Sequence, residues 1–410
     1  MMKLKQMLCC GAAMFMTATG ANAAVINLID NGGVSGSQAE KGFRIAALYW
    51  GSVLSNDVTI NLGVGFKALP ENVIGSTGST RIDYSVASWE RRIATSKSNS
   101  TLDQAAILPT LNASGGATFI TSGTDANGND DTTVKQVVLG NSASSKTLYA
   151  NTSVLKAIGA IGANNPVVDG NVTFSSDFAF DFDPSNGVDR DSFDFLGVAI
   201  HEIGHALGFV SGVDFLDYYG KPNGPGVGTV DVGYSLNDTS IYSALDMFRY
   251  SKDPSKLVYG NDPVLDLAVG SDSYFSIDGG KTALFGNFFS TGAYNGDENQ
   301  ASHWMDTEGN TFEKACTTQL GIMDPTFCFG QSGQVTALDL AAYDAMGWNI
   351  SFDVLKNPGY LATTSGIYRQ FLSAVPEPTT WAMMLTGFAM VGGALRGGRS
   401  RTKVKVKFAA

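Results

Sequence analysis

One short segment of the sequence has residue types and spacing that suit metal-dependent hydrolysis. Two of the three histidines, His201 and His205, stand four residues apart. At this spacing on a helix both imidazoles lie on one face, where they can bind one ion. Glu202 is next to them and is placed to accept a proton from metal-bound water. Zinc would lower the pKa of that water to about 7, so the HExxH pattern of residues 201–205 predicts a hydrolytic zinc site.

The third protein ligand of such a zinc ion is not found beside the motif. A catalytic zinc needs three protein ligands and one open position. The extended pattern HExxHxxGxxH would place the third ligand at position 211, which is Ser211, although Gly208 is present to turn the chain. A more distant residue must therefore complete the site. The candidates are the only remaining imidazole and four carboxylates, namely His303, Asp214, Asp217, Glu308 and Glu313.

Hydrophobic periodicity indicates which elements carry these residues. The segment that contains HExxH has helical periodicity and ends near Gly208, a residue type common at helix ends. A second amphipathic segment is capped by Thr336 and ends at Gly347. Helices and strands in this order predict an α+β catalytic domain over residues 24–355. The predicted helices cover residues 40–55, 192–209 and 336–346, and the predicted strands cover residues 58–66 and 171–182.

A long segment without clear periodicity separates HExxH from the remaining histidine. Residues 210–300 are rich in Gly, Asp, Tyr and Ser, and 94 residues lie between Gly208 and His303. We interpret this segment as a large insertion within the catalytic domain, or as a small subdomain. In either case it separates two halves of one predicted site.

The motifs taken together resemble a known protease family. HEIGHALGF, a long insertion, SHW at 302–304 and IMDP at 322–325 look like the leishmanolysin type of metzincin, over about residues 193–348. The resemblance implies a zincin-like α+β fold with a mixed sheet, an active-site helix, a large insertion and a C-terminal helix. It also implies three zinc ligands, a general base and a methionine turn beneath the metal, which by position are His201, His205 and His303, Glu202, and Met323.

Plainer interpretations exist for the residues beyond the motif. His303 would otherwise be a structural or surface histidine. Met323 would otherwise be a core methionine, which a methionine beneath a metal site partly is. The 210–300 insertion departs from recognisable family sequence, and this departure leaves the substrate specificity open.

The cysteines predict one disulfide. Cys9 and Cys10 lie in the N-terminal segment that we expect to be removed, which leaves Cys316 and Cys328. Two cysteines close in sequence in an exported chain are expected to pair. A zinc site made from these thiols is the alternative, but no CxxC spacing supports it. A disulfide here would hold the turn that contains Met323.

Both ends of the chain carry targeting patterns. Residues 1–23 combine Lys3 and Lys5, an apolar run and an A-x-A site, as in a signal peptide. After a linker at 356–374, residues 375–401 contain VPEP, an uncharged run and arginines, followed by a basic tail to residue 410. This order resembles the PEP-CTERM sorting signal of Gram-negative bacteria, which implies processing by an exosortase-type enzyme. The apolar run is short for a spanning helix, so we expect transient association with the inner membrane.

The charge balance bears on partners. The net charge is −11, and eight of the 27 basic residues lie in the two terminal segments, so the part between them is strongly acidic. This argues against a nucleic acid as partner. Two acidic loops are candidates for Ca²⁺ sites, with Asx turns as the commoner explanation. They contain Asp125, Asn127, Asn129, Asp130 and Asp131, and Asp181, Asp183, Ser185, Asp189, Asp191 and Asp194.

These observations predict an exported, zinc-dependent endopeptidase that acts on protein or peptide substrates. Glu202 would activate water and pass its proton to the leaving amine. One alternative is a non-proteolytic surface or matrix protein with a degenerate metal site. Another is a zinc hydrolase that acts on glycans or esters.

Overall fold

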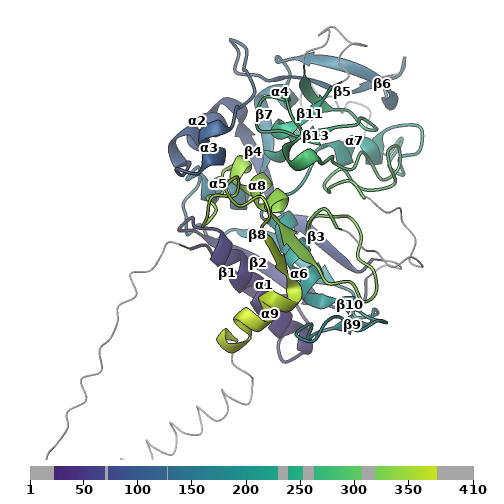
Figure 1. Ribbon diagram of the computed structural model, residues 1–410. Coiled ribbons are helices and arrows are strands. Elements are labelled where there is room, and N and C mark those ends of the chain that lie inside the picture. The colour runs from purple at the N-terminus through teal and green to yellow at the C-terminus, as the bar shows by residue number, and fades with distance from the viewer. Residues whose placement is uncertain are drawn as a thin grey trace, which may run out of the picture.

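The HExxH segment lies on a helix that packs against a four-stranded mixed sheet (Figure 1). The strand order is β1-β2-β8-β3, with the first three strands parallel and β3 antiparallel to β8. Strand β2 is buried along almost its whole length, as expected for a parallel strand that is covered on both faces. The strands are β1 Val25–Asp30, β2 Thr59–Phe66, β8 Val168–Phe174 and β3 Gly75–Ser79. The computed structural model describes residues 23–69, 73–126, 128–229, 239–252, 263–306 and 319–375.

Two helices, α1 (Gln38–Val53) and α6 (Phe195–Ala206), pack against each other and against this sheet. The ring of Phe43 on α1 lies 5.0 Å from that of Phe174 on β8 and 5.2 Å from that of Phe195 on α6. Asp194 caps α6 by accepting a hydrogen bond from the backbone N–H of Gly197. The helix ends before Gly208, whose φ of +125° suits glycine. These contacts fix the helix that carries HExxH.

A second sheet joins residues from before and after the site helix (Figure 1). Its order is β13-β11-β12-β5-β6, and β12 runs parallel to β5. The segment 210–300 is therefore built into a sheet with strands from the N-terminal half of the chain. Its described residues also form α7 and the 3₁₀ helices η1 and η3. The bounds are β5 Thr118–Thr124, β6 Asp130–Leu139, α7 Val213–Tyr219, η1 Leu245–Phe248, β11 Arg249–Ser251, β12 Val264–Leu267, β13 Tyr274–Phe275 and η3 Leu284–Gly286.

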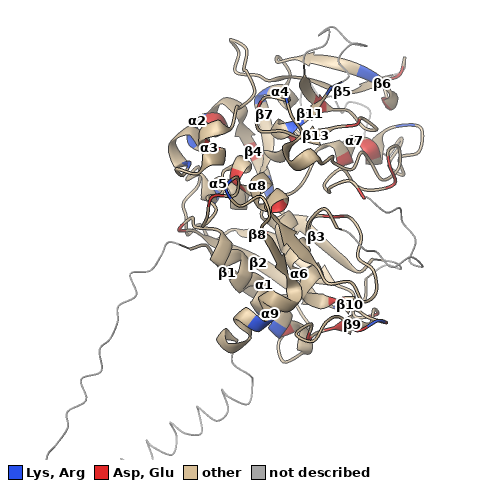
Figure 2. Cartoon of the chain, in the orientation of Figure 1, with Lys and Arg blue, Asp and Glu red and all other residues tan. Residues whose placement is uncertain are grey.

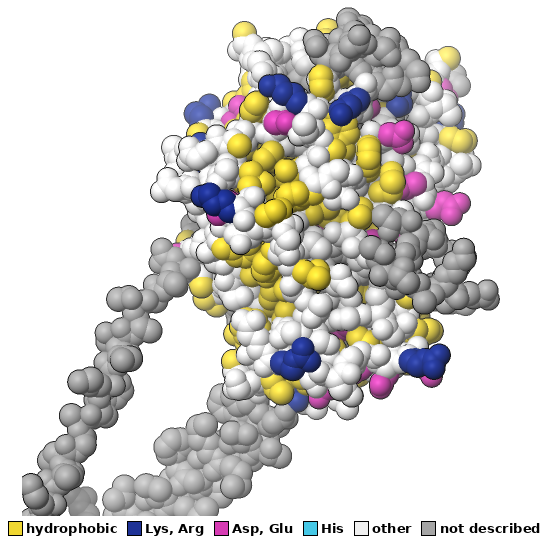
Figure 3. Space-filling view, viewed as in Figure 1, with side chains coloured by type: hydrophobic (Ala, Val, Ile, Leu, Met, Phe, Trp, Pro, Cys, Tyr) yellow, Lys and Arg dark blue, Asp and Glu magenta, His cyan; other side chains and the backbone are white. Residues whose placement is uncertain are grey.

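Shorter elements connect and cover the two sheets. Helix α8 begins after Thr336, which forms a capping box with Asp339. One buried hydrophobic cluster contains residues of both sheets. On the surface, apolar side chains gather across the middle of the face drawn in Figure 3. The remaining elements are β4 Arg81–Ser85, α2 Val86–Ser96, α3 Thr101–Ala105, α4 Ala143–Lys146, β7 Thr147–Asn151, α5 Thr152–Ala157, β9 Phe180–Asp181, β10 Phe193–Asp194, β14 Gln334–Thr336, α8 Ala337–Met346, β15 Leu361–Thr363, α9 Thr364–Phe371 and η4 Leu372–Ala374.

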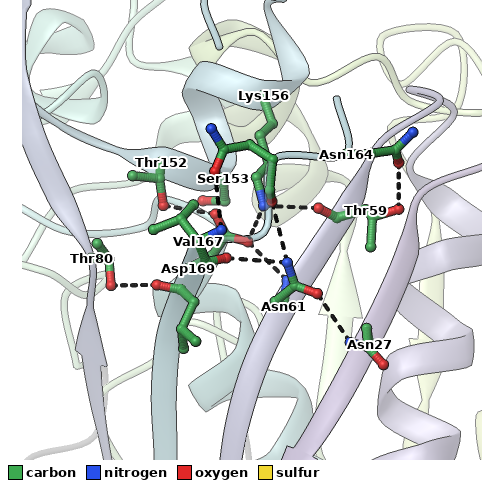
Figure 4. Close-up of polar contacts among 12 residues, drawn as sticks. Asn27, Thr59, Asn61, Thr80, Thr152, Ser153, Lys156, Asn164, Val167 and Asp169 are labelled. Carbon is green, nitrogen blue, oxygen red and sulfur yellow. Dashed lines mark hydrogen bonds and ion pairs between the residues drawn. The ribbon is translucent and has the colours of Figure 1, made fainter. Parts of the chain in front are cut away.

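A buried ion pair joins α5 to the first sheet (Figure 4). Lys156 Nζ lies 2.6 Å from Asp169 Oδ2, and neither side chain is exposed. The lysine also donates to the carbonyl of Thr59, and the carboxylate accepts from Asn61 N–H and the Thr152 hydroxyl. Both charges therefore have hydrogen-bond partners, which a buried ion pair needs. The backbone carbonyl of Asp169 accepts a hydrogen bond from the backbone N–H of Thr80, which lies between β3 and β4.

The structure confirms an α+β protein and the three predicted helices, within a few residues at their ends. The single strand predicted over 171–182 is wrong, because β8 ends at Phe174 and β9 begins at Phe180. Residues 76–100, for which no element is predicted above, contain β4 and α2 and most of β3. Among the described residues no helix is long and apolar enough to cross a membrane. The predicted signal peptide, apart from its last residue, and the C-terminal sorting segment beyond Val375 lie outside them.

Candidate metal centre

The structure brings the three histidines of the chain together. The Nε2 atoms of His201, His205 and His303 are separated by 3.1, 3.2 and 3.3 Å, although His201 and His303 are 102 residues apart in sequence. Each histidine offers one ligand atom, and the group is able to hold one metal ion. Three nitrogens bound tetrahedrally at 2.0–2.1 Å would be about 3.3–3.4 Å apart. The observed triangle is therefore close to the size that a tetrahedral metal requires.

Backbone carbonyls orient all three rings. His201 Nδ1 lies 2.7 Å from the carbonyl oxygen of Ile322, and His205 Nδ1 lies 2.6 Å from that of Phe209. His303 Nδ1 lies 3.2 Å from the carbonyl oxygen of Gln300. A carbonyl oxygen only accepts, so each Nδ1 must carry the proton and donate it. In a neutral ring this leaves an unprotonated Nε2, which is the form that binds a metal.

Burial keeps these rings neutral. It lowers the pKa of His201 to about 3, with a smaller contribution from His205, and it lowers the pKa of His205 to about 4. The pKa of His303 is also well below its ordinary value, mainly through burial. Three nitrogen lone pairs then face one another, and no N–H lies between them to form a hydrogen bond. A cation at their centre would remove this repulsion, which favours a metal site over a structural histidine cluster.

Glu202 lies beside the triad and is held by the edge strand of the first sheet. The hydroxyl of Thr77 on β3 lies 2.7 Å from Glu202 Oε2 and 2.9 Å from the Glu202 carbonyl oxygen. Burial raises the pKa of Glu202 to about 7, and the Thr77 hydrogen bond opposes this shift. A carboxylate with a pKa near the working pH both takes and returns a proton efficiently. This is the behaviour expected of a general base and acid.

Met323 lies directly beneath the helix that carries the motif. It is fully buried, and a Cβ at Gly204 would lie 2.6 Å from its sulfur, so only glycine allows this close approach. The Tyr343 hydroxyl lies 3.5 Å from the same sulfur. The Met323 carbonyl accepts from the N–H of Trp304, the residue after His303. The turn at 321–325 is therefore in contact with both ligand-bearing segments.

Asp339, which the sequence did not single out, fixes this turn. Its buried carboxylate accepts from the backbone N–H groups of Ile322 and Met323 at 2.9 and 3.2 Å, and from the indole N–H of Trp304 at 2.9 Å. It also completes the capping box of α8 with Thr336. The Thr-x-x-Asp spacing was the available signal for this cap. It gave no sign that the same carboxylate holds the metal-site turn, because those partners are distant in sequence.

The carboxylates proposed as alternative ligands have other partners. Asp214 on α7 accepts from the N–H groups of Ala301 and Ser302, and so holds the segment before His303. Asp217, on the same helix, accepts from the N–H groups of residues 294 and 295. In Figure 2 the ribbon of α7 is red where these acidic residues lie. Among the described residues the histidines alone form a three-ligand group, and candidates Glu308 and Glu313 lie outside the described residues.

A cleft of about 1110 Å³ opens onto the triad and Glu202. One wall consists of residues 73–79, which include all of β3, followed by Arg81. Another part of the lining comes from the aromatic residues of α7, Phe215, Tyr218 and Tyr219. Strand β3 pairs only with β8 among the described strands, and every residue of β3 lines this cleft. The site therefore combines three inward-facing nitrogens with a space large enough for an extended ligand.

Two further predictions are only partly covered by the described residues. Cys328 is buried and disulfide-bonded, but Cys316, its predicted partner, lies outside the described residues. In the acidic loops, Asp181 accepts from the backbone N–H groups of Asp183 and Asp189, and Asp125 accepts from that of Asn129. The contact between Asp181 and Asp183, two residues apart, is that of an Asx turn, and calcium binding stays a prediction.

Comparison of the chain with protein-family models, with curated proteins and with solved structures gives no match.

Proposed function

We propose that the chain is a zinc-dependent endopeptidase in which His201, His205 and His303 bind the metal and Glu202 is the general base. The observation that carries the proposal is the convergence of three unprotonated Nε2 atoms beside a buried carboxylate, at the base of an open cleft. Three protein ligands and an accessible fourth position are the arrangement of a catalytic zinc site rather than a structural one.

Zinc is the proposed ion because the ligand set suits it. Three neutral imidazoles at tetrahedral spacing match the donor atoms and geometry that zinc prefers. Carbonyl acceptors at every Nδ1 fix the rings in the form that binds metal. Zinc bound there would acidify water and polarise a carbonyl oxygen.

Glu202 supplies the proton transfers of the proposed reaction. Burial raises its pKa above the ordinary value, which suits a group that takes a proton from the attacking water and returns it to the leaving amine. Thr77 holds the carboxylate in place by a hydrogen bond to Oε2. A fixed position is required because the base must stay within hydrogen-bond reach of the proton that it accepts.

The edge of β3 supports a peptide as substrate over a glycan or an ester. Residues 73–79 line the cleft, and β3 has no second neighbour among the described strands. An extended peptide is able to pair with such an edge through main-chain hydrogen bonds. This pairing would place its backbone along the row of residues that includes Thr77, next to Glu202. The resemblance of residues 193–348 to leishmanolysin-type metzincins points to the same reaction and to a metzincin fold.

The proposal extends to the location of the protein. Residues 1–23 would direct export, and residues 375–401 would anchor the chain transiently in the inner membrane of a Gram-negative cell and be processed by an exosortase-type enzyme. The sequence patterns alone carry this part of the proposal.

The test uses the purified full chain. Bound metal is measured by elemental analysis, and cleavage of casein is compared among the wild type, Glu202→Ala and His303→Ala. We expect about one zinc per chain, loss of cleavage by a factor of at least about 100 in Glu202→Ala with zinc retained, and loss of zinc in His303→Ala. Glu90→Gln is the matched control, because burial also raises the pKa of Glu90 to about 7, but this residue does not line the cleft.

Two results would overturn the proposal. If the zinc-loaded wild type cleaves no peptide, the protein is not a peptidase. Its site would then be a non-proteolytic metal site or the site of a hydrolase for other substrates. Full zinc affinity in His303→Ala removes His303 from the ligand set.

A further inference from the structure

Arg81 lies on the cleft wall, next along the chain from the strand that holds the general base. Thr77 contacts Glu202, and the Ser79 hydroxyl donates to the carbonyl oxygen of His205 at 3.1 Å. Arg81 follows two residues later, as the first residue of β4, and lines the same cleft. A peptide extended along β3 would continue toward this side chain.

The guanidinium of Arg81 is held in place without a charged partner. Its Cζ lies 4.6 Å from the ring centroid of Tyr149, in a cation–π contact. No ion pair and no side-chain hydrogen bond joins Arg81 to another of the described residues. Burial lowers the pKa of Arg81, although arginine stays charged. A cation that has lost part of its hydration and has no anion beside it is a favourable place for a ligand carboxylate.

The acidic residues around Arg81 already have other partners. Asp83 accepts a hydrogen bond from the Ser240 hydroxyl. Asp214 is occupied by the segment that precedes His303. The buried Asp246 accepts from Ser211 Oγ and Gly212 N–H, both within 2.8 Å. Asp214 and Asp246 favour the charged form of Arg81 from a distance but do not pair with it.

Arg81 is also the one Lys or Arg side chain in the described lining of the cleft. We propose that Arg81 is a specificity-determining residue that binds a carboxylate of the substrate, either an acidic side chain or the C-terminal carboxylate of the peptide. The planar guanidinium is able to form two parallel hydrogen bonds to a carboxylate, and stacking on Tyr149 limits its rotation beforehand. This inference rests on the proposed peptidase function.

Cleavage profiles provide the first test. The zinc-loaded full chain is incubated with a proteome-derived peptide mixture, and the cut sites are identified by mass spectrometry for the wild type, Arg81→Gln and Arg81→Lys. We expect the wild type to favour Asp and Glu about tenfold at one subsite, or to cut at a fixed distance from a free C-terminus. Arg81→Gln should lose this preference, and Arg81→Lys should keep part of it.

Arg92→Gln is the matched control, since Arg92 is exposed on α2 and does not line the cleft. A wild type with neither preference overturns the proposal. A preference that persists in Arg81→Gln does the same.

A binding test separates this proposal from the peptidase function. The Glu202→Gln variant is titrated into a labelled octapeptide with alternating glutamates, and into its glutamine counterpart, each with a free and an amidated C-terminus. Fluorescence anisotropy should give about tenfold tighter binding of the peptides that carry the relevant carboxylate, and Arg81→Gln should abolish the difference. If the wild type cleaves nothing but this difference is found, the peptidase proposal fails and carboxylate binding stands. Equal or undetectable binding of all four peptides overturns carboxylate binding.

Discussion

Individual side chains and single backbone groups set the chemistry of the candidate centre. Each imidazole donates from Nδ1 to a carbonyl oxygen, and the three carbonyls belong to Ile322, Phe209 and Gln300. Glu202 has one side-chain partner among the described residues, the hydroxyl of Thr77. The three histidines are therefore oriented by the backbone, while Glu202, the proposed general base, is oriented by a side chain. Substitution at Thr77 tests the base without removing a ligand.

Thr77→Val should shift the pH dependence of the reaction. The Thr77 hydroxyl lowers the pKa of Glu202, so its loss raises that pKa above about 7 and leaves less ionised base at neutral pH. The acid limb of the kcat/KM profile should move to higher pH, with a loss of roughly threefold to tenfold at pH 7. Thr77→Ser should keep the original limb. Thr80→Val is the control, because the Thr80 hydroxyl donates to the carbonyl of Val168 instead. An unchanged limb in Thr77→Val would show that this hydrogen bond does not tune the base.

At the scale of elements, α7 and α8 hold the metal-site segments that follow the 210–300 region. Asp214 on α7 binds the backbone just before His303, and Asp339 on α8 binds the backbone of the turn that contains Met323. Each is a single carboxylate that accepts several N–H groups; Asp339 is fully buried and Asp214 is half-buried. Loss of one acceptor oxygen leaves buried donors without a partner, which costs more than the hydrogen bond itself contributed.

Asp214→Asn should weaken zinc binding. An amide replaces one acceptor oxygen with a donor group that would face the N–H groups of Ala301 and Ser302. The position of His303 then relaxes, and the zinc Kd should rise about 10- to 100-fold, as for other residues that support metal ligands. Competition with a chromophoric chelator measures this change. Asp217→Asn is the control on the same helix, because Asp217 binds the backbone of residues 294–295. Equal losses in the two variants would mean that α7 acts only through general stability.

Asp344 on α8, which does not line the cleft, should make stability depend on pH. Its carboxyl lies near Ser100 and Asp103, its Oδ1 has no hydrogen-bond partner among the described residues, and burial raises its pKa from 3.8 to about 8. Because the folded pKa lies above the unfolded value, the protonated form stabilises the fold. That stabilisation is complete below about pH 4 and is lost as the pH rises to about 8.

Asp344→Asn mimics the protonated form and should remove this dependence. The unfolding midpoint of the variant should exceed that of the wild type at pH 8.5, and the difference should shrink toward pH 4. Thermal unfolding between pH 4 and 9 measures both chains. A constant difference across this range would contradict the raised pKa.

Spacing in the sequence predicted only those site residues that lie close to one another along the chain. His201, Glu202 and His205 were visible because one turn of helix brings them together. His303 followed from the count of histidines and from the family resemblance, and the structure places it beside the other two. Thr77, Asp339 and Arg81 were not found from the sequence. Thr77 and Glu202, for example, are 125 residues apart. The pairing of β12 with β5 likewise joins segments that are distant in sequence. No periodicity encodes such pairings, since they depend on how complete elements pack.

On the scale of the whole molecule, the metal would link distant parts of one chain. The ligands come from α6 and from the segment after the second sheet, 98 residues beyond His205. An ion that binds only the folded state adds stability by mass action, about 4 kcal/mol at 1,000 times its Kd. The effect should be visible in the unfolding of the entire domain.

Removal of metal should therefore lower the unfolding temperature. We expect a chelator to reduce the midpoint of the full chain by several degrees, and added zinc to restore it. Glu202→Gln, which keeps all three ligands, should respond like the wild type. His303→Ala should respond much less. A chelator that leaves the wild-type midpoint unchanged would show that the triad holds no ion tightly.

The use of main-chain oxygens to tether the imidazoles has a consequence for how the site tolerates mutation. No substitution at Ile322, Phe209 or Gln300 removes the backbone carbonyl that each contributes. Changes in those side chains should therefore leave the proton on Nδ1 of each histidine. In a saturation mutagenesis screen for zinc retention, these three positions should accept varied residues of suitable size. Intolerant positions should instead be those that shape the backbone path, such as Gly204 and Asp339. The path of the backbone, and not a second set of polar side chains, would thus determine how the three imidazoles are oriented.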